Sequence, residues 1–218
     1  IHDSTDLALG ENMTISFNTF TIQGATGSAC LEIAYHTNSS VANNTCLMSD
    51  DDDTYGIHYT DSGSYVDNIR MENNTFDGAN ISHIAYIGGD NSTFTKNTLT
   101  GDGGCATCRG MTVTMTNSQL ANNTIYLYGN GSSVTAYGIS LGGTGLDVVN
   151  NLIIMDETRT AEGDPESHYA FGIGLDSGGS DYNITNNTIN VNGSSVQARA
   201  INHWAGGGGS YRITQNKI

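Results

Sequence analysis

The chain has 218 residues and carries 22 acidic against 7 basic side chains, a net charge of −15 that disfavours binding to nucleic acid or to anionic membrane surfaces. It contains no run of about 18 apolar residues, so a membrane-spanning helix is excluded. Only 13% of the residues are charged, whereas glycine, asparagine, serine and threonine are abundant, which favours many short strands joined by turns.

One six-residue pattern recurs along the chain: an apolar residue, two variable residues, asparagine, one variable residue and a second apolar residue. In chain order it occupies residues 15–20, 41–46, 71–76, 94–99, 120–125, 148–153, 184–189 and 213–218. The shared asparagines are 23 to 36 residues apart, a period typical of a solenoid with loops of variable length inserted into a constant coil. They are Asn18, Asn44, Asn74, Asn97, Asn123, Asn151, Asn187 and Asn216.

A short stretch with apolar residues at alternate positions precedes each shared asparagine by 11 to 17 residues. Apolar residues at every second position predict a half-buried strand. In chain order the members of this pattern are Leu7/Leu9, Leu31/Ile33, Ile57/Tyr59, Ile84/Tyr86, Met111/Val113, Ile139/Leu141, Ile173/Leu175 and Ile201/His203, the last with histidine at its second position.

Together with one strand on each side of the shared asparagine, every coil is expected to hold three short strands. One coil cannot bury its apolar side, but stacked coils bury a continuous column. The sequence therefore predicts a single all-β domain over residues 1–218, a parallel β-solenoid of about eight coils. No capping segment is recognisable at either end, which favours a fragment of a longer chain or end-to-end stacking of copies.

Glycine precedes the alternating strand in Y-G-I-H-Y, R-G-M-T-V, Y-G-I-S-L and F-G-I-G-L. With the apolar-x-x-N turns, these strands resemble the right-handed parallel β-helix superfamily, which includes pectate-lyase-like folds and PbH1-type repeats, and are similar to the repeats of polymorphic outer-membrane adhesins. The resemblance covers residues 5–218 and implies a right-handed coil. It does not imply one reaction, because the same coil carries lyases, hydrolases, epimerases, adhesins and viral fibres.

The shared asparagines are expected to have a structural role. Asparagine tolerates left-handed backbone geometry, and its amide can pair with the matching amide about 4.8 Å away in the next coil. We therefore expect the eight shared asparagines to form a buried internal ladder.

Sequons of the type Asn-x-Ser/Thr occur eleven times, and we expect N-linked glycans at several of them. Four arise from the N-N-T turn itself and are open to coincidence, whereas the other seven lie outside that motif. Glycosylation would place the protein outside the cell or on the cell surface. The candidates are Asn12, Asn38, Asn43, Asn73, Asn80, Asn91, Asn122, Asn130, Asn183, Asn186 and Asn192.

Four cysteines are present: Cys30, Cys46, Cys105 and Cys108. Disulfides are favoured, with free thiols or a metal site as the alternatives, because the C-x-x-C at 105–108 has no second C-x-x-C to complete a metal site.

Catalysis on a β-helix is expected on the outward positions of one strand face, here Ala8, Glu32, His58, Ala85, Thr112, Ser140, Gly174 and Asn202. Glu32 and His58 fall on adjacent coils with Asp61 just beyond, which makes them candidates for acid–base chemistry, the alternative being a solvated polar pair. Trp204 is a candidate platform for sugar stacking. The five arginines are scattered along the chain, which counts against a polyuronate substrate; they are Arg70, Arg109, Arg159, Arg199 and Arg212.

Two loops add weaker candidates. The run Asp50, Asp51, Asp52 and Asp53 is a candidate for Ca²⁺, although a solvated loop explains it as well and no cofactor is required. The insertion at 155–171 contains D-P-E-S-H, with Asp164, Glu166 and His168. It is faintly similar to the acidic-Pro-His motif of alginate-epimerase β-helices, but the order of the residues and their neighbours depart from that motif.

From these features we expect an extracellular structural or adhesive surface module, glycosylated and stacked end to end into a filament or layer. The alternative is a carbohydrate-active β-helix, a polysaccharide lyase, hydrolase or epimerase, or a carbohydrate-binding one. A metal-handling periplasmic β-helix is a third hypothesis, disfavoured because cysteine and histidine are not clustered.

Overall fold

The computed structural model describes residues 10–23, 29–33, 36–49, 55–59, 66–79, 83–102, 107–129, 135–157, 169–176, 178–193, 197–203 and 210–218. Within these ranges every regular element is a β-strand. No helix among them is long and apolar enough to cross a membrane.

Three long parallel sheets run the length of the molecule, beside a two-stranded sheet A of β1 (Gly10–Glu11) and β5 (His36–Thr37). Sheet B holds eight strands: β2 (Thr14–Ser16), β6 (Ser40–Ala42), β9 (Arg70–Glu72), β12 (Thr93–Thr95), β15 (Gln119–Ala121), β18 (Asp147–Val149), β21 (Tyr182–Thr185) and β24 (Tyr211–Thr214). Sheet C holds seven: β3 (Thr19–Gln23), β7 (Thr45–Ser49), β10 (Thr75–Ala79), β13 (Thr98–Asp102), β16 (Thr124–Gly129), β19 (Leu152–Glu157) and β22 (Thr188–Gly193). Sheet D also holds seven: β4 (Ala29–Ile33), β8 (Tyr55–Tyr59), β11 (His83–Ile87), β14 (Thr107–Val113), β17 (Thr135–Leu141), β20 (Tyr169–Leu175) and β23 (Gln197–His203).

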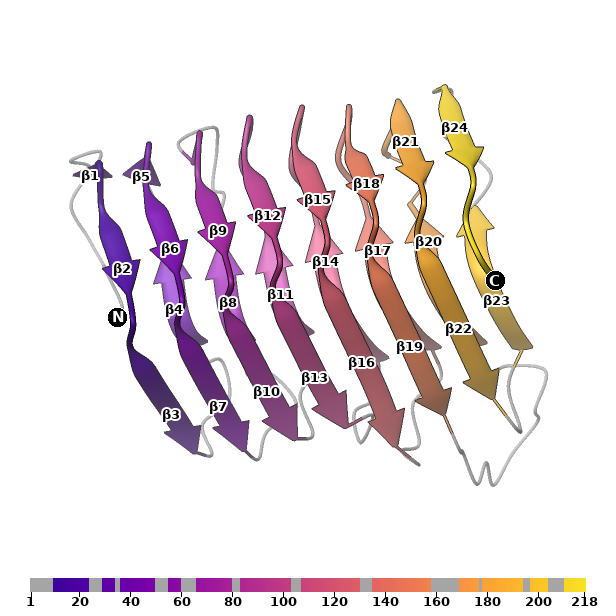
Figure 1. The fold of residues 1–218 in the computed structure, drawn as a ribbon, viewed down its shortest axis with the longest axis horizontal. Coiled ribbons are helices and arrows are strands. Elements are labelled where there is room, and N and C mark those ends of the chain that lie inside the picture. The colour runs from indigo at the N-terminus through magenta and orange to yellow at the C-terminus, as the bar shows by residue number, and fades with distance from the viewer. Residues whose placement is uncertain are drawn as a thin grey trace.

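Each coil contributes one strand to each long sheet, so the all-β parallel solenoid with three strands per coil is confirmed. Sheets B and C face the viewer in Figure 1, and sheet D lies behind them. The number of complete coils is slightly smaller than the eight expected, since sheets C and D have seven strands in the described residues. The first alternating pair, Leu7 and Leu9, lies outside those residues.

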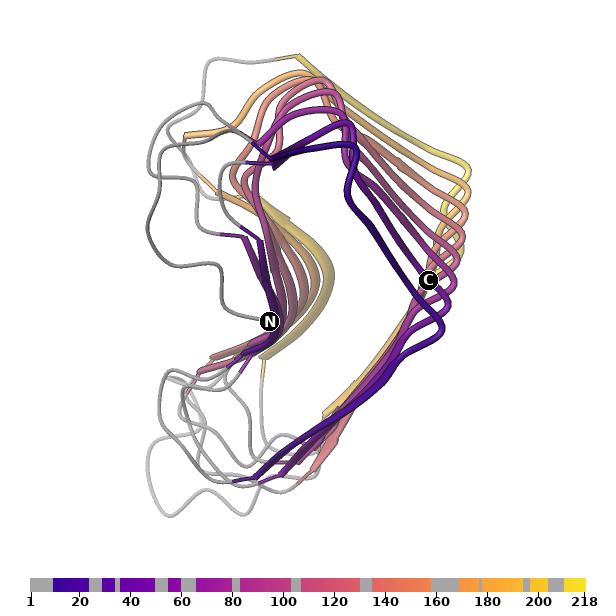
Figure 2. The ribbon, with the colours of Figure 1, turned by 90° about the vertical axis from the view of Figure 1, so that its left-hand side faces the viewer.

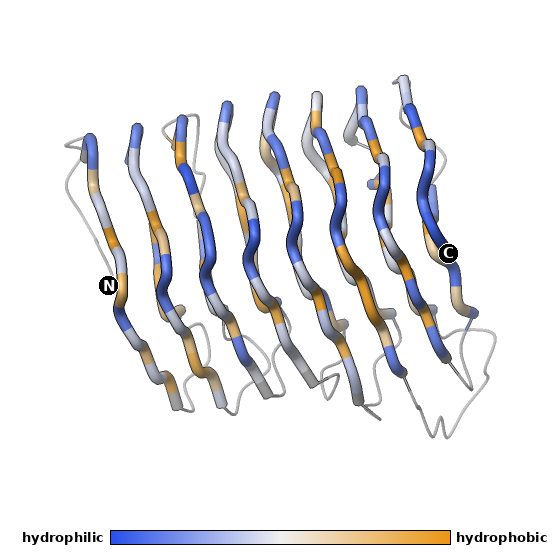
Figure 3. The backbone as a smooth tube through the Cα atoms, viewed as in Figure 1, coloured by the Kyte–Doolittle hydropathy of each residue, from blue (hydrophilic) through white to orange (hydrophobic). Residues whose placement is uncertain are grey.

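The core lies between sheet D and the pair formed by sheets B and C, as the view along the stack shows (Figure 2). The strands alternate apolar and polar residues along their length (Figure 3). In sheet B the inward positions of successive coils are in register and almost fully buried, and each such side chain contributes about 1.5–3 kcal/mol by burial. This column comprises Val41, Met71, Phe94, Leu120, Val148 and Ile184.

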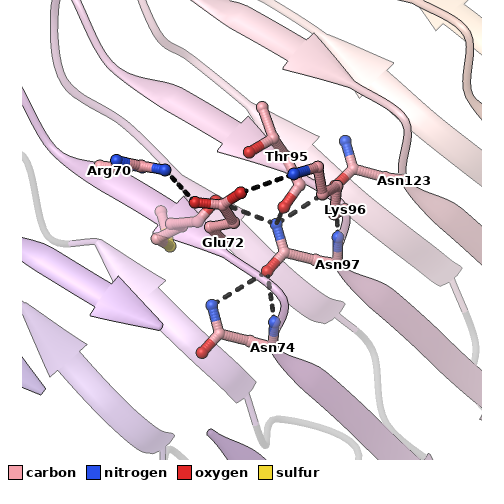
Figure 4. Close-up of polar contacts among 8 residues, drawn as sticks. Arg70, Glu72, Asn74, Thr95, Lys96, Asn97 and Asn123 are labelled. Atoms are coloured by element: carbon pink, nitrogen blue, oxygen red, sulfur yellow. Dashed lines mark hydrogen bonds and ion pairs between the residues drawn. The ribbon is translucent and has the colours of Figure 1, made fainter. Parts of the chain in front are cut away.

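The eight shared asparagines form one continuous ladder at the corner between sheets B and C. The Nδ2 and backbone N–H groups of each donate to Oδ1 of the asparagine in the next coil, at 2.9–3.2 Å, from Asn18 through Asn216. Figure 4 shows Asn97 between Asn74 and Asn123. Six of the eight are buried, while Asn18 is exposed and Asn216 is half-buried.

Left-handed backbone geometry was expected at the ladder asparagine itself, and this prediction is wrong. The left-handed residue is the one before it, with φ between 56° and 59°. The reversal at this residue turns the chain so that both N–H donors of the ladder asparagine point at the next coil. The left-handed residues of this corner are Phe17, Asn43, Asn73, Lys96, Asn122, Asn150, Asn186 and Gln215.

A shorter serine ladder occupies the corner that leads into sheet B, which follows sheet A in the first two coils and isolated bridges in later ones, and sequence reasoning missed it. The backbone N–H of Met13 donates to Oγ of Ser39, and that of Ser92 donates to Oγ of Ser118. Each serine hydroxyl donates to the carbonyl two residues earlier, so one hydroxyl satisfies groups in two coils. Serine holds only some rungs of this corner, which is why no repeat was visible.

Sheet D bends at a column of small residues, because the side chains there point at sheet C. A Cβ on Gly138 would lie 2.5 Å from Cγ2 of Ile153 and 2.6 Å from the carbonyl oxygen of Gly172. In β11 this position holds Ile84, and sheet C compensates with Gly101, whose Cβ would lie 2.7 Å from Cδ1 of Ile84.

The register expected for β11 is therefore wrong by one residue. Ala85 pairs with Ile57 and Met111 on the inward side, and Tyr86 pairs with His58 on the outward side. Alternation failed as a guide because the bend places two consecutive residues, Ile84 and Ala85, inside the core.

A disulfide joins Cys30 of β4 to Cys46 of β7, with the two Cα atoms 6.0 Å apart. It ties sheet D to sheet C across the core. Cys108 is also disulfide-bonded, and Cys105 lies outside the described residues. Intramolecular disulfides are typical of oxidising compartments.

Candidate functional site

The outer face of sheet D carries two columns of side chains that run along the stack. The aromatic column lies just before the bend and comprises Ala29, Tyr55, His83, Arg109, Tyr137, Phe171 and Arg199. The polar column lies just after it and comprises Glu32, His58, Tyr86, Thr112, Ser140, Gly174 and Asn202. Figure 2 shows that the sheet curves toward the core, so its outer side is concave.

Five side chains form a contiguous group in the N-terminal half of this face, the histidine cluster of Tyr55, His58, His83, Tyr86 and Arg109. The ring of Tyr55 stacks on His58 at 4.4 Å and on His83 at 5.5 Å between centroids. Tyr86 meets both imidazoles edge-on, at 5.5 and 6.2 Å. All five side chains are half-buried.

Arg109 fixes the protonation state of His83. Its Nη1 donates to Nε2 of His83 at 3.0 Å. Because a guanidinium can only donate, Nε2 must be the acceptor and the imidazole proton lies on Nδ1. Burial, reinforced by the charges of Arg109 and His58, lowers the pKa of His83 to about 4, so this imidazole is neutral at neutral pH.

His58 is held neutral by burial but has a carboxylate beside it. Burial lowers the pKa of His58 below 6.5, and the charge of Glu32 opposes this. The two residues pair directly in neighbouring strands. A neutral imidazole next to a carboxylate can accept a proton and have its positive charge stabilised.

Aromatic rings continue the face toward the C-terminus. Arg109 lies 5.5 Å above the ring of Tyr137, Tyr137 lies 5.3 Å from Phe171, and Arg199 lies 5.9 Å from Phe171. The ring of Tyr137 also covers Gly174, where a Cβ would come within 2.6 Å of Cδ1 of Tyr137. Any larger residue at position 174 would therefore displace the ring of Tyr137.

Two buried polar atoms in the middle of this face have no hydrogen-bond partner among the described residues: Nε of Arg109 and Oγ1 of Thr112. Thr112 is 9% exposed. Buried polar groups are normally paired, so these two atoms mark a place where the packing of this face leaves polar groups without a partner among the described residues.

The structure places only some of the candidate site residues that the sequence suggested. Glu32 and His58 are adjacent, and they border the histidine cluster. Asp61, Trp204, the Asp50–Asp53 run and the Asp164, Glu166 and His168 insertion lie outside the described residues. Among the described residues, no group of three or more His, Cys, Asp or Glu side chains is placed to hold a metal ion.

Sequence reasoning missed most of the cluster because it counted only one outward column. The bend gives sheet D a second column, and it brings Arg109 and Arg199, which are far apart in sequence, onto the same face. A signal was present: the residue before each glycine in the Y-G-I, R-G-M, Y-G-I and F-G-I strands is large, and these residues are Tyr55, Arg109, Tyr137 and Phe171.

A hollow of about 260 Å³ lies between β21 and β24 and is lined in part by Asp181, Tyr182 and Tyr211. The carboxylate of Asp181 in this hollow already accepts hydrogen bonds from the hydroxyl and the backbone N–H of Ser210, and these bonds lower its pKa. The histidine cluster is therefore the stronger candidate site.

No family model matches the chain, and no curated protein matches its sequence. Among solved structures, the A-module of the Azotobacter vinelandii mannuronan C-5 epimerase AlgE4 is similar over 95% of this chain, with a TM-score of 0.66 and 15% identity. The chain spans 54% of that module's length. The fold of this chain is thus the right-handed parallel β-helix.

Two further structures align with low TM-scores. They are QnrB1, a plasmid-mediated fluoroquinolone resistance protein (TM-score 0.18, 10% identity, 90% of this chain and 92% of that one), and the Dettilon tailspike protein (TM-score 0.22, 11% identity, 88% and 60%).

Proposed function

We propose that the outer face of sheet D binds an extended polysaccharide and that the histidine cluster transfers a proton to and from a sugar residue of it. The observation that carries the proposal is the packing of Tyr55, His58, His83, Tyr86 and Arg109 into one half-buried group on the concave side of the sheet. A solved β-helix with a similar fold is a mannuronan C-5 epimerase, which supports a glycan as the ligand class.

The repeat of the β-helix suits a linear glycan. Successive coils are about 4.8 Å apart, and a pyranose residue is of similar length. The spacing of the aromatic column along the stack therefore matches the spacing of sugars along such a chain. The half-buried rings of Tyr55 and Tyr137 present apolar faces to sugar C–H groups, and their phenol hydroxyls add hydrogen bonds. The ring of Phe171 is fully buried and supports its neighbours in the column.

The charges on this face favour a uronate within the polymer. The chain as a whole is strongly acidic, yet two of its five arginines, Arg109 and Arg199, lie in the aromatic column. A guanidinium matches a carboxylate in shape and charge, and Arg109 and Arg199 each place one on this face. We depart here from the expectation that scattered arginines count against a polyuronate, because two of the five share this face.

The reaction class that such a set supports is proton abstraction from the carbon next to a carboxylate. Arg109 would hold the carboxylate and stabilise the negative charge that develops on it. His58 would accept the proton, with Glu32 stabilising the imidazolium, and a phenol of the cluster would return a proton from the opposite face or assist departure of the 4-oxygen. Return of a proton from the opposite face inverts the configuration of the sugar carbon. Departure of the 4-oxygen cleaves the polysaccharide by elimination.

Incubation with polymannuronate and a panel of other acidic and neutral polysaccharides in D₂O tests this function. We expect deuterium at the carbon next to the carboxylate, seen by NMR, or an unsaturated product seen by ultraviolet absorbance. The His58→Gln variant should lose turnover and keep binding. Arg70→Ala is the matched control, because Arg70 lies on sheet B and pairs with Glu72 (Figure 4).

The second function is that of a glycan-binding adhesive module at the cell surface. The rigid asparagine ladder and the disulfide of an oxidising compartment support it. Binding of a polysaccharide without deuterium exchange or cleavage would favour this function, and absence of binding to every polysaccharide would refute both.

A further inference from the structure

We infer that N-linked glycans are attached in two columns along the edges of sheet B, so that this side of the molecule is covered and the outer face of sheet D stays open. This inference does not depend on what the sheet D face binds. It concerns nine of the eleven sequons, since Asn80 and Asn130 lie outside the described residues.

Seven of the nine described sequons occupy left-handed corner positions, with φ between 50° and 59°. Asn12, Asn38 and Asn91 lie at the corner that leads into sheet B. Asn43, Asn73, Asn122 and Asn186 lie at the corner that leads out of it into sheet C. The sequons therefore follow both edges of one sheet.

The corner asparagines present their amides to solvent. All seven side chains are exposed. Within the described part of the chain, only Asn91 uses its Nδ2, which donates to Asp67 at 3.0 Å. The adjacent ladder asparagines are the reverse case, because Asn44 and Asn123 are buried and donate Nδ2 to two or more acceptors.

The structural requirements of the coil explain only some of the sequons. At the corner between sheets B and C it requires a left-handed residue, a ladder asparagine and a first strand residue, so N-N-T arises there without glycosylation. At the corner that leads into sheet B, the second residue after the left-handed residue varies along the stack: Thr14, Ser40, Arg70, Thr93, Gln119, Asp147 and Asn183. A hydroxyl follows Asn12, Asn38 and Asn91 although the coil does not demand one.

The remaining two described sequons also avoid sheet D. Asn183 lies on β21 of sheet B and Asn192 on β22 of sheet C. The described strands of sheet D contain no sequon. Sheets B and C lie across the core from sheet D (Figure 2), so glycans at these positions would point away from the histidine cluster.

The chemistry of the compartment agrees with this inference. The Cys30–Cys46 disulfide indicates an oxidising environment, where N-glycosylation also takes place.

Glycopeptide mapping of the protein purified from its native source, before and after enzymatic deglycosylation, tests the inference. We expect glycan mass at Asn12, Asn38 or Asn91 and at the corner between sheets B and C. Absence of glycan mass, or glycans confined to Asn80 and Asn130, would overturn it.

A single substitution in a glycosylating secretory host separates modification from folding. Thr93→Ala removes the sequon of Asn91 but leaves that asparagine and its turn intact. We expect loss of one glycan with an unchanged melting temperature, and Thr95→Ala, two residues on along the same strand, should lose none. Equal glycan mass in the Thr93→Ala variant and the parent protein would contradict the assignment of Asn91.

Discussion

Replacing Asn123 by alanine should destabilise the solenoid far more than the same replacement at Asn18. The Asn123 side chain takes part in four hydrogen bonds: its Oδ1 accepts from Nδ2 and the backbone N–H of Asn97, and its Nδ2 donates to Asn151 and to the carbonyl of Phe94. All these groups are buried. At about 1 kcal/mol each, their loss costs about 4 kcal/mol.

Asn18 is the matched control because it is the exposed end rung of the same ladder. Its side chain donates only to Ser16 and to Asn44, and water can replace both bonds. We expect a loss of about 1 kcal/mol or less there. For a chain of this size about 4 kcal/mol corresponds to a melting temperature lower by roughly 10 °C.

Thermal unfolding of the two variants, followed by far-ultraviolet circular dichroism, measures this difference. If Asn123→Ala lowered the melting temperature no more than Asn18→Ala, the ladder would not be a main stabilising element of the frame.

Three further perturbations test other parts of the structure. Gly138→Ala should lower the free energy of unfolding by about 1–3 kcal/mol in chemical denaturation, because its Cβ would lie 2.5 Å from Cγ2 of Ile153; no loss would show that sheet D is not bent as described. Replacing Cys30 and Cys46 together by serine should cost about 3 kcal/mol under non-reducing conditions, and equal stability would argue against the crosslink. His83 has a pKa of about 4 in the folded state against 6.5 unfolded, so its contribution to stability is present above pH 6.5 and is lost as pH falls toward 4. Between these pH values the free energy of unfolding of His83→Gln should fall less steeply than that of the parent protein. Parallel curves of unfolding free energy against pH would refute the burial of a neutral imidazole.

The coil repeat was predictable because its most demanding residue, the ladder asparagine, occurs once in every coil. A ladder asparagine needs its neighbours above and below, so the same residue recurs at every coil, from Asn18 to Asn216. Sheet D was less predictable, since its bend places Ile84 and Ala85 together inside the core and moves Tyr86 outward. Strict alternation cannot represent that geometry.

The candidate site was harder to predict because its side chains occupy equivalent positions in successive strands but differ in residue type. The aromatic column contains tyrosine, histidine, arginine and phenylalanine at equivalent positions, so no repeat is visible in the letters. Only the register of the strands shows that Arg109 lies between His83 and Tyr137.

The proposed function requires that the outer face of sheet D bind a polysaccharide. Isothermal titration of polymannuronate into the parent protein, Arg109→Ala and Arg70→Ala measures this directly. We expect binding by the parent protein and by Arg70→Ala, and at least a tenfold loss of affinity in Arg109→Ala, which removes one charge-assisted contact of about 1.5–3 kcal/mol. Equal affinity in all three proteins would contradict the account.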